Sequence, residues 1–188
     1  NCDIIIFSDF RHGIFNKKSI NELNKSIKKR IFKAADSQVA TRWGDISEFK
    51  HFDLIAPNEK EVRYSLSDQD SSISELTREL QKKSSCKNLI LKLGSKGVIA
   101  VGLEKNKKIS FGIPAFARNV TDAVGAGDAL LAYSSLSLFK TKSITISSIL
   151  GSLAAACECE MEGNIAVKKD LILKKIRILE ESSKYKSK

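Results

Sequence analysis

The chain has 188 residues, of which 42% are hydrophobic and 29% charged, and its formal net charge is +10. This balance is typical of one globular domain with a sizeable core, and it excludes a disordered or fibrous chain. No apolar run approaches the roughly 20 residues that cross a bilayer. The first residues show no leader-peptide pattern. We therefore expect a cytoplasmic protein without a membrane partner.

The first half of the chain alternates between short apolar segments and amphipathic ones. Apolar runs of four to six residues are typical of strands covered on both faces in a parallel sheet, and a 3.6-residue period is typical of helices. We expect strands over residues 3–8, 31–35 and 52–56, and helices over residues 17–29, 59–66 and 72–83. The last of these helices opens with a capping-box pattern, Ser72 to Glu75.

The second half contains a buried strand, a hairpin and three helices. We expect a strand over 89–93, a hairpin of 98–101 with 108–111, a loop over 112–122, and helices over 127–139, 145–160 and 171–182. The helix over 145–160 is apolar nearly all round, so it should be largely buried. No repeat or linker divides the chain. The order predicts a single α/β domain over residues 1–188, with a mostly parallel sheet flanked by helices.

The four cysteines, Cys2, Cys86, Cys157 and Cys159, show no pairing pattern. One residue separates the last two, which is less than in a zinc knuckle, and no histidine lies near them. We expect reduced thiols, as is usual in the cytoplasm.

The positive charge raises the alternative of a nucleic-acid partner. Lysines and arginines are spread along the whole chain with acids between them. There is no nucleic-acid module and no interleaving of aromatic and basic residues that could stack bases. We expect no nucleic-acid partner. A binder driven by charge alone would show a steep salt dependence of binding.

The strongest motif is Asp122-Ala123-Val124-Gly125-Ala126-Gly127-Asp128, which leads directly into a predicted helix. The glycines let the backbone approach a ligand closely, and the N–H groups of a first helical turn, with the helix dipole, favour an anion. Asp128 is placed to accept a proton from an attacking hydroxyl. The alternative is an aspartate that only caps a helix after a glycine turn.

This motif resembles the DTxGAGD signature of the PfkB/ribokinase family of carbohydrate kinases, with Ala123 where the family usually has Thr. The resemblance implies that Asp128 is the catalytic base and that Gly125, Ala126 and Gly127 form the anion hole. It also implies a site for a monovalent cation, K⁺, near the loop of Asp122.

Asn58 and Glu61 follow a predicted strand and lie on one side of a first helical turn. Alone, this pattern would indicate no more than an acidic helix start. Beside the first motif it resembles the family's N-x-x-E element. The resemblance implies that Glu61 and Asn58 hold Mg²⁺ through water near the phosphates, and that Asn58 also contacts the nucleotide.

The segment Leu91-Lys92-Leu93-Gly94-Ser95-Lys96-Gly97 resembles the family's strand and turn along the nucleotide. Lys92, Gly94 and Gly97 are the candidate nucleotide contacts, and the spacing is not that of a Walker A loop. An ordinary glycine-rich turn is the alternative. Met161 falls where the family closes around the adenine, although core packing explains it equally well.

The segment Ser8-Asp9-Phe10-Arg11-His12-Gly13 resembles an "sDYxkG" element that is strongest in the heptose-phosphate kinase branch, with His12 where that branch usually has Lys. Arg11 or His12 could contact phosphate and Asp9 could orient the loop, or the segment could be only a capped turn. Asp36-Ser37-Gln38 resembles the "vDpk" element of the same branch.

The resemblance spans residues 4–166, in the order of the family's C-terminal half. It implies a three-layer ribokinase-like fold whose N-terminal part and lid are missing here. The implied function is an ATP-dependent kinase that uses Mg²⁺ and transfers the γ-phosphate to a hydroxyl of a sugar or sugar phosphate. A homodimer remains open.

Two alternatives to a sugar kinase stay open. The first is a truncated, catalytically incompetent fragment that only binds a nucleotide or another protein. The second lies within the superfamily and is a vitamin kinase for pyridoxal or hydroxymethylpyrimidine, although those kinases usually have Thr in place of the middle Ala.

Overall fold

A mixed β-sheet forms the centre of the computed structural model, which describes residues 2–38, 44–163 and 165–184. Within these residues the sheet has six strands that lie side by side in chain order. They are β1 (Ile4–Asp9), β2 (Phe32–Ser37), β3 (Leu54–Ile55), β4 (Asn88–Lys92), β5 (Val98–Glu104) and β6 (Lys107–Ile113). Strands β1 to β4 are parallel, and β5 and β6 add an antiparallel hairpin.

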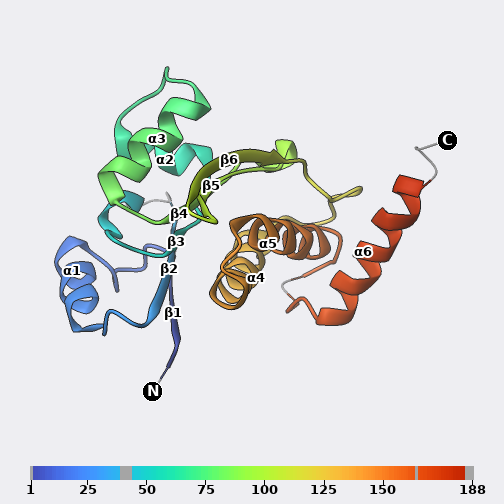
Figure 1. Ribbon diagram of the computed structural model, residues 1–188, viewed down its shortest axis with the longest axis horizontal. Helices are drawn as coiled ribbons and strands as arrows, with labels where there is room; N and C mark the ends of the chain where they lie inside the picture. The colour runs from blue at the N-terminus through green and yellow to red at the C-terminus, as the bar shows by residue number, and fades with distance from the viewer. Residues whose placement is uncertain (1, 39–43, 164, 185–188) are drawn as a thin grey trace.

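Helices cover both faces of the sheet, so the fold has three layers (Figure 1). One face carries α1 (Lys17–Ser26), α2 (Glu59–Leu66) and α3 (Ile73–Ser84), and the other carries α4 (Ala126–Thr141) and α5 (Ile144–Cys159). Helix α6 (Lys169–Lys184) packs on the outside of α5. Two short 3-10 turns, η1 (Ile46–Glu48) and η2 (Gly94–Lys96), complete the described elements.

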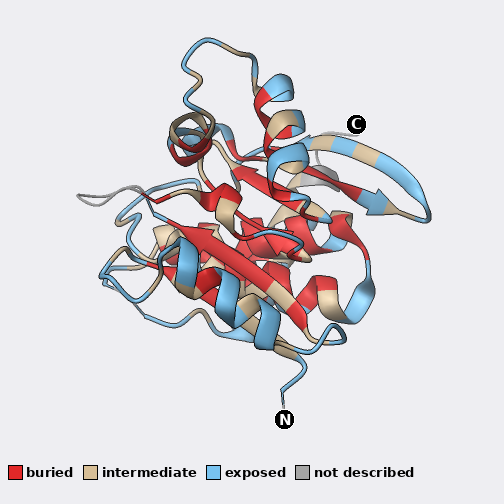
Figure 2. Cartoon of the chain, turned by 90° about the vertical axis from the view of Figure 1, so that its left-hand side faces the viewer, coloured by how far each residue is buried: buried red, intermediate tan, exposed pale blue. Residues whose placement is uncertain are grey.

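The strands alternate their side chains between two hydrophobic clusters. Ile55 points to the α1–α3 side, whereas its neighbour Leu54 points to α4 and α5. Both residues are fully buried, because successive side chains of a strand point to opposite faces and each face is covered. Figure 2 shows the result, with buried strands at the centre and exposed residues on the outer helix surfaces.

Helices α4 and α5 approach each other closely along a seam of small residues. Ser134 and Ser147 exchange hydrogen bonds across the seam, from each hydroxyl to the other residue's carbonyl, at 3.2 and 2.8 Å. A Cβ on Gly151 would collide with the Ser134 hydroxyl. The two helices are therefore in near backbone contact over the sheet.

The predicted elements are all present, with different ends. The strand predicted over 52–56 is shorter, because only Leu54–Ile55 forms regular strand pairing. The Ala56 N–H still donates to the Ala35 carbonyl. The helix predicted to run to residue 29 ends at Ser26, because Ile27 turns to an extended conformation. The hairpin strands are longer than predicted, so residues 112 and 113 belong to β6 and not to the loop.

Four further expectations can be compared with the structure. The capping box between Ser72 and Glu75 is confirmed, and α5 is buried over most of its surface. All four cysteines lie in the described part of the chain and are free thiols. No helix among the described residues is long and apolar enough to cross a membrane.

Four aromatic rings fill the core between the sheet and α1. Phe7, Phe15, Phe49 and Phe52 meet with ring centroids 5.2–6.4 Å apart, mostly edge to face. Phe49 follows η1 and is fully buried. We expect Phe49→Ala to lower the free energy of unfolding by about 3–5 kcal/mol, because it leaves a cavity among these rings.

Urea unfolding followed by circular dichroism measures this loss. Leu103→Ala is the control, since Leu103 is 59% exposed, and it should change stability by no more than about 0.5 kcal/mol. Equal losses in the two variants would show that the ring cluster is not part of the stabilising core.

Candidate active site

The carboxyl ends of the four parallel strands meet at one edge of the sheet, and a buried ion pair lies there. Asp36 near the end of β2 accepts a hydrogen bond from the ammonium of Lys92 at the end of β4. Their side chains are only 9% and 16% exposed. Parallel strands place their ends together, so residues 56 positions apart become partners. This edge is the usual position for ligands in open α/β sheets.

Asn58 and Glu61 sit beside this ion pair. The Pro57 carbonyl accepts a hydrogen bond from Lys92 N–H at 2.8 Å, and Asn58 forms a parallel bridge with Lys92. Asn58 is the N-cap of α2, and its backbone N–H and side-chain amide donate to the two oxygens of Glu61 at 2.7 and 2.6 Å. The pair thus forms a capping box that also fixes a buried carboxylate at the site.

Two acids and one lysine share this buried region. Burial, and then repulsion by Asp36, raise the pKa of Glu61 to about 7, although Lys92 acts in the opposite direction. Burial also raises the pKa of Asp36, against the stabilising contact of Lys92. With both acids ionised, the group carries one negative charge that Lys92 does not balance. Such a carboxylate-rich site suits a hydrated divalent cation.

The glycine motif forms the start of α4. Gly125 is the N-cap and has φ 85°, a left-handed conformation that favours glycine. Gly127 lies in the first turn, where an added Cβ would be 3.3 Å from the Lys92 ammonium and 3.8 Å from Asp36 Oδ2. The N–H of Ala126 donates to the Ala123 carbonyl at 3.3 Å. The helix start therefore faces the Asp36–Lys92 pair.

Asp128 lies on the exposed side of this first turn. Its Oδ1 accepts a hydrogen bond of 3.0 Å from the hydroxyl of Ser8 on β1, 120 residues earlier in the chain. Asp122 accepts from the N–H of Val124 at 2.9 Å and so closes the turn that precedes Gly125. The two acids of the motif therefore differ in position: one shapes the loop, and the other faces solvent beside β1.

A cavity of about 430 Å³ opens beside the helix start. Its lining is mostly apolar and combines the β4–β5 turn, the loop before α4, and one face each of α4 and α5. The lining includes five predicted site residues, namely Lys92, Gly94, Gly97, Ala126 and Gly127. Apolar walls with a few polar groups are typical of small-molecule and cofactor sites.

Other predicted residues lie outside this cavity lining. Gly125 and Asp128 belong to the start of α4, Asn58 and Glu61 to the start of α2, and Asp122 to the loop before α4, and none of them lines the cavity. Met161 is not among the lining residues, and Cys159, two positions earlier, takes that place.

Three residues at the site were given no role from the sequence, although Ser8 and Asp36 belong to segments that resemble elements of the heptose-phosphate kinase branch. Asp36 and Ser8 become neighbours of the motifs only through strand order, which a local pattern does not show. Ser152 on α5 lines the cavity, and its buried hydroxyl has no hydrogen-bond partner among the described residues. A lone serine in an apolar helix carries no recognisable signal.

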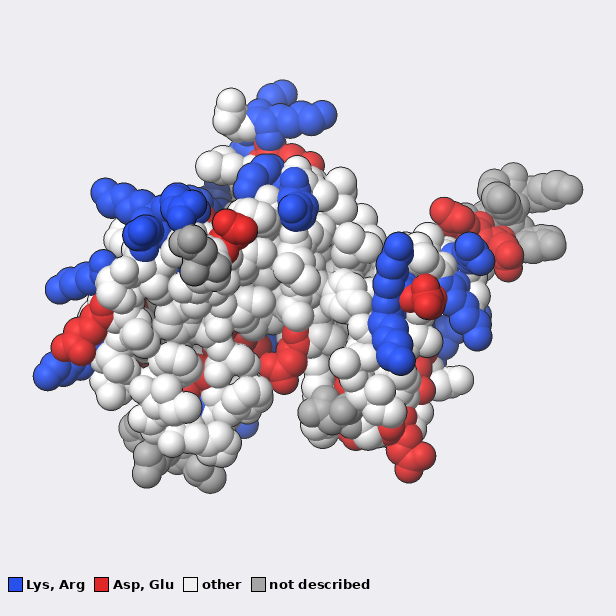
Figure 3. Space-filling view, turned by 90° about the horizontal axis from the view of Figure 1, so that it is seen from below, with Lys and Arg blue, Asp and Glu red and all other residues white. Residues whose placement is uncertain are grey.

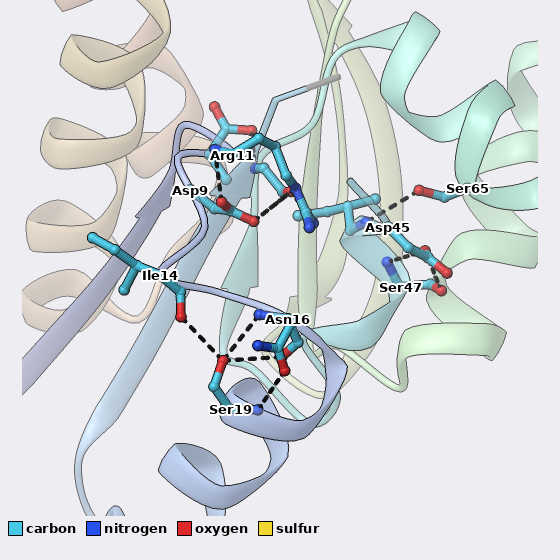
Figure 4. A network of polar contacts seen from close by, with 11 residues as sticks. Asp9, Arg11, Ile14, Asn16, Ser19, Asp45, Ser47 and Ser65 are labelled. Atoms are coloured by element: carbon cyan, nitrogen blue, oxygen red, sulfur yellow. Dashed lines mark hydrogen bonds and ion pairs between the residues drawn. The ribbon is translucent and has the colours of Figure 1, made fainter. Parts of the chain in front are cut away.

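The end of β1 forms a separate polar network (Figure 4). Arg11, at φ 59°, contacts Asp9 Oδ2 at 2.9 Å and donates to the Ser37 hydroxyl at 2.8 Å. The Arg11 side chain is 8% exposed, so its guanidinium is occupied within the protein. Its backbone N–H also donates to Asp9, which matches the interpretation of this segment as a capped turn.

The charged side chains are unevenly distributed on the face shown in Figure 3. The surface is hollowed by a notch in this view, with acidic side chains beside it, and most lysines and arginines lie away from it.

Within the described residues, no three His, Cys, Asp or Glu side chains gather as a ready metal site. A cation bound beside Asp36 and Glu61 would therefore also need ligands from water or from a bound phosphate.

Residues 4–170 match the family model described as "pfkB family carbohydrate kinase". The chain belongs to the pfkB family of carbohydrate kinases. It is 28% identical over 172 residues to the bifunctional protein HldE of Desulfatibacillum aliphaticivorans, covering 88% of this chain and 33% of that protein. HldE of Helicobacter acinonychis is 29% identical over 157 residues, covering 82% and 32%. The chain thus spans about a third of the length of these curated relatives.

Solved structures of sugar kinases share the fold. The ribokinase of Thermotoga maritima superimposes with a TM-score of 0.73 at 22% identity, over 93% of this chain and 57% of that one. Phosphofructokinase-2 of Escherichia coli, solved with potassium, gives 0.78 at 19% identity, over 94% and 57%. The expected three-layer ribokinase-like architecture is confirmed, and the match covers over half of each of these chains.

The raised pKa of Glu61 predicts a pH-dependent stability. The folded chain holds this proton more tightly than the unfolded chain, whose pKa is near 4.5, so the free energy of unfolding should fall as the pH rises from 4.5 through about 7. Glu61→Gln should remove the Glu61 contribution, which is about 2 kcal/mol over this range. Urea unfolding between about pH 5 and pH 8 measures the difference in slope.

Glu59→Gln in the same helical turn is the control, because the Glu59 side chain is 40% exposed and pairs with Arg63. An unchanged pH slope in Glu61→Gln would contradict the assignment of this titration to Glu61.

Proposed function

We propose that the chain is the nucleotide-binding and phosphoryl-transfer part of an ATP-dependent kinase that acts on a hydroxyl of a sugar or sugar phosphate. The observation that carries the proposal is the placement of the α4 start. The glycine motif faces both the apolar cavity and Lys92, while Asp128 in the same turn stands on the exposed side. One helical turn thus adjoins both a nucleotide site and an open surface for an acceptor.

The charges are suited to the phosphate end of a nucleotide. The N–H groups of the first turn and the positive end of the α4 dipole attract an anion, and Lys92 lies against Gly127. The adenine would occupy the apolar part of the cavity, where Ser152 supplies one buried hydroxyl. Gly94 and Gly97 allow the β4–β5 turn to lie close to the nucleotide.

Metal ions complete the proposed site. Glu61 and Asn58 would hold Mg²⁺ through water, which supplies positive charge to the phosphates of ATP. The excess negative charge of Asp36 and Glu61 over Lys92 supports a cation at this position. A K⁺ ion beside the Asp122 turn is part of the same proposal.

The proposed reaction is a direct transfer. Asp128 accepts the proton of the acceptor hydroxyl, whose oxygen bonds to the γ-phosphorus as the bond to the β-phosphate oxygen breaks and ADP leaves. The Gly125–Gly127 turn and Lys92 stabilise the charge on the transferred group. Membership of the carbohydrate kinase family supports a sugar or sugar phosphate as the acceptor, and the resemblance of the segment from Ser8 to Gly13 supports a sugar phosphate of the heptose type.

Asp128→Asn tests the base. We expect the rate of γ-phosphate transfer from ATP to a panel of sugars and sugar phosphates, heptose 7-phosphate included, to fall by about 10²- to 10⁴-fold. ATP affinity, measured by calorimetry, should be unchanged or tighter, because a negative charge near the phosphates is removed. Asp170→Asn is the control, since Asp170 is an exposed acid in the first turn of α6.

The outcomes separate the candidate functions. Transfer that survives in Asp128→Asn would show that Asp128 is not the base. ATP binding without transfer to any acceptor by the wild type would favour a nucleotide-binding module. Absence of ATP binding would contradict the proposed function as a whole.

Gly127→Ala tests the closeness of the α4 start to Lys92. The added methyl group would stand 3.3 Å from the ammonium and displace it by a few tenths of an ångström. We expect ATP affinity to fall about tenfold or more, whereas stability should stay equal or rise by up to about 1 kcal/mol, because alanine favours a helix.

Calorimetry and urea unfolding measure the two effects separately. Gly112→Ala on β6 is the control, since its Cβ would meet its nearest neighbour at 3.9 Å. Unchanged ATP affinity in Gly127→Ala would place the phosphates elsewhere.

A further inference from the structure

The loop between β6 and α4 forms one wall of the cavity proposed for the nucleotide. Ala117, Val120 and Ala123 from this loop line the cavity opposite α5. Phe116 at the start of the loop packs against the hydrophobic clusters of α4 and α5, but residues 118–121 are largely exposed. The position of this exposed part depends on specific polar contacts.

Three backbone N–H groups attach this loop to the end of α5. Thr121 and Asp122 N–H donate to the Cys159 carbonyl at 2.7 and 3.2 Å. Arg118 N–H donates to Glu160 Oε1 at 2.8 Å. The first two contacts use the helix terminus itself, which any sequence offers. The third depends on a side chain, because only the Glu160 carboxylate reaches Arg118.

Lys175 on α6 holds that carboxylate from the other side. Its ammonium donates to the same oxygen, Glu160 Oε1, in an ion pair whose Lys175 side chain is 10% exposed. Ile172 and Ile176 of the same helix pack on α5 in a hydrophobic cluster with Leu153 and Cys157. The helix is thus anchored beside the cavity, and burying a lysine ammonium is costly unless it has such a partner.

We propose that Lys175 is a positioning residue for nucleotide binding: it fixes Glu160, Glu160 fixes Arg118 N–H, and the loop of residues 117–123 thereby stays closed against the cavity. This inference rests on the proposed function. Lys175 lines a separate groove with Arg118, Thr121 and Glu160, and it is not among the residues that line the cavity. It therefore acts without contact with the nucleotide.

The energetic reason is preorganisation. A loop that is already ordered loses less conformational entropy when the nucleotide binds, so the nucleotide binds more tightly. Glu160 must be ionised to accept both hydrogen bonds well. Burial opposes ionisation, but Lys175 and the Arg118 N–H outweigh it, so the pKa of Glu160 lies below its ordinary value. The carboxylate is therefore charged at neutral pH.

The test uses Lys175→Met, which keeps the length and apolar stem of the side chain and removes its charge. On the full chain we expect ATP to bind about five- to tenfold more weakly. Hydrogen exchange should become faster at the amides of Arg118, Thr121 and Asp122 without any nucleotide present. Lys175→Arg should restore both properties, because a guanidinium can also donate to Glu160.

Two further variants separate positioning from general damage. Lys174→Met changes an exposed lysine on the same helix and should leave ATP affinity and loop exchange unchanged. Glu160→Gln keeps an oxygen for Arg118 N–H but removes the charge, and it should weaken ATP binding by about threefold. If Lys175→Met does not fold, Glu160→Gln carries the test alone.

Each outcome decides the inference. Normal ATP affinity in both Lys175→Met and Glu160→Gln would overturn it while leaving the proposed function intact. If Lys175→Met weakens ATP binding only because the structure is lost, hydrogen exchange will increase equally throughout α5 and α6. This result too would overturn the inference. A wild type that binds no ATP would overturn this inference together with the proposed function.

Discussion

The site depends on a buried arrangement of three charges, Asp36, Glu61 and Lys92. Two acids and one ammonium brought out of water cost free energy that hydrogen bonds only partly recover. The three groups stay together because three separate strands end at this edge of the sheet and hold them in place. Gly127 in the first turn of α4 lies close to the ammonium. The positions of the buried charges therefore depend on the order of the strands and on the start of α4 beside them.

Local patterns predicted much of this protein, because the physics behind them is local. Apolar runs and helical periods placed every strand and helix, and Ser72 with Glu75 marked a helix start that the structure contains. Element ends were less accurate, since Ile27 leaves its helix to pack in the core and β5 and β6 lengthen each other by pairing. Those effects depend on residues distant in sequence.

The candidate site divides in the same way. The glycine motif and the Asn58–Glu61 pair are visible because short spacing controls their geometry. The roles of Asp36, Ser8 and Ser152 could not be predicted, because each gains its role from a partner or a cavity formed by another part of the chain. Met161 was proposed from its position along the chain; α5 ends so that Cys159 lines the cavity, and a contact of Met161 with a nucleotide stays a prediction.

The close seam between α4 and α5 has a consequence for motion. Gly151 and the paired serines leave no room for the helices to slide, so the helix that carries Asp128 and the helix that carries Ser152 behave as one rigid body. The ends of the cavity that lie on α4 and on α5 therefore keep a constant separation. Any opening to admit or release a ligand must come from the facing segments, which are the β4–β5 turn and the loop before α4.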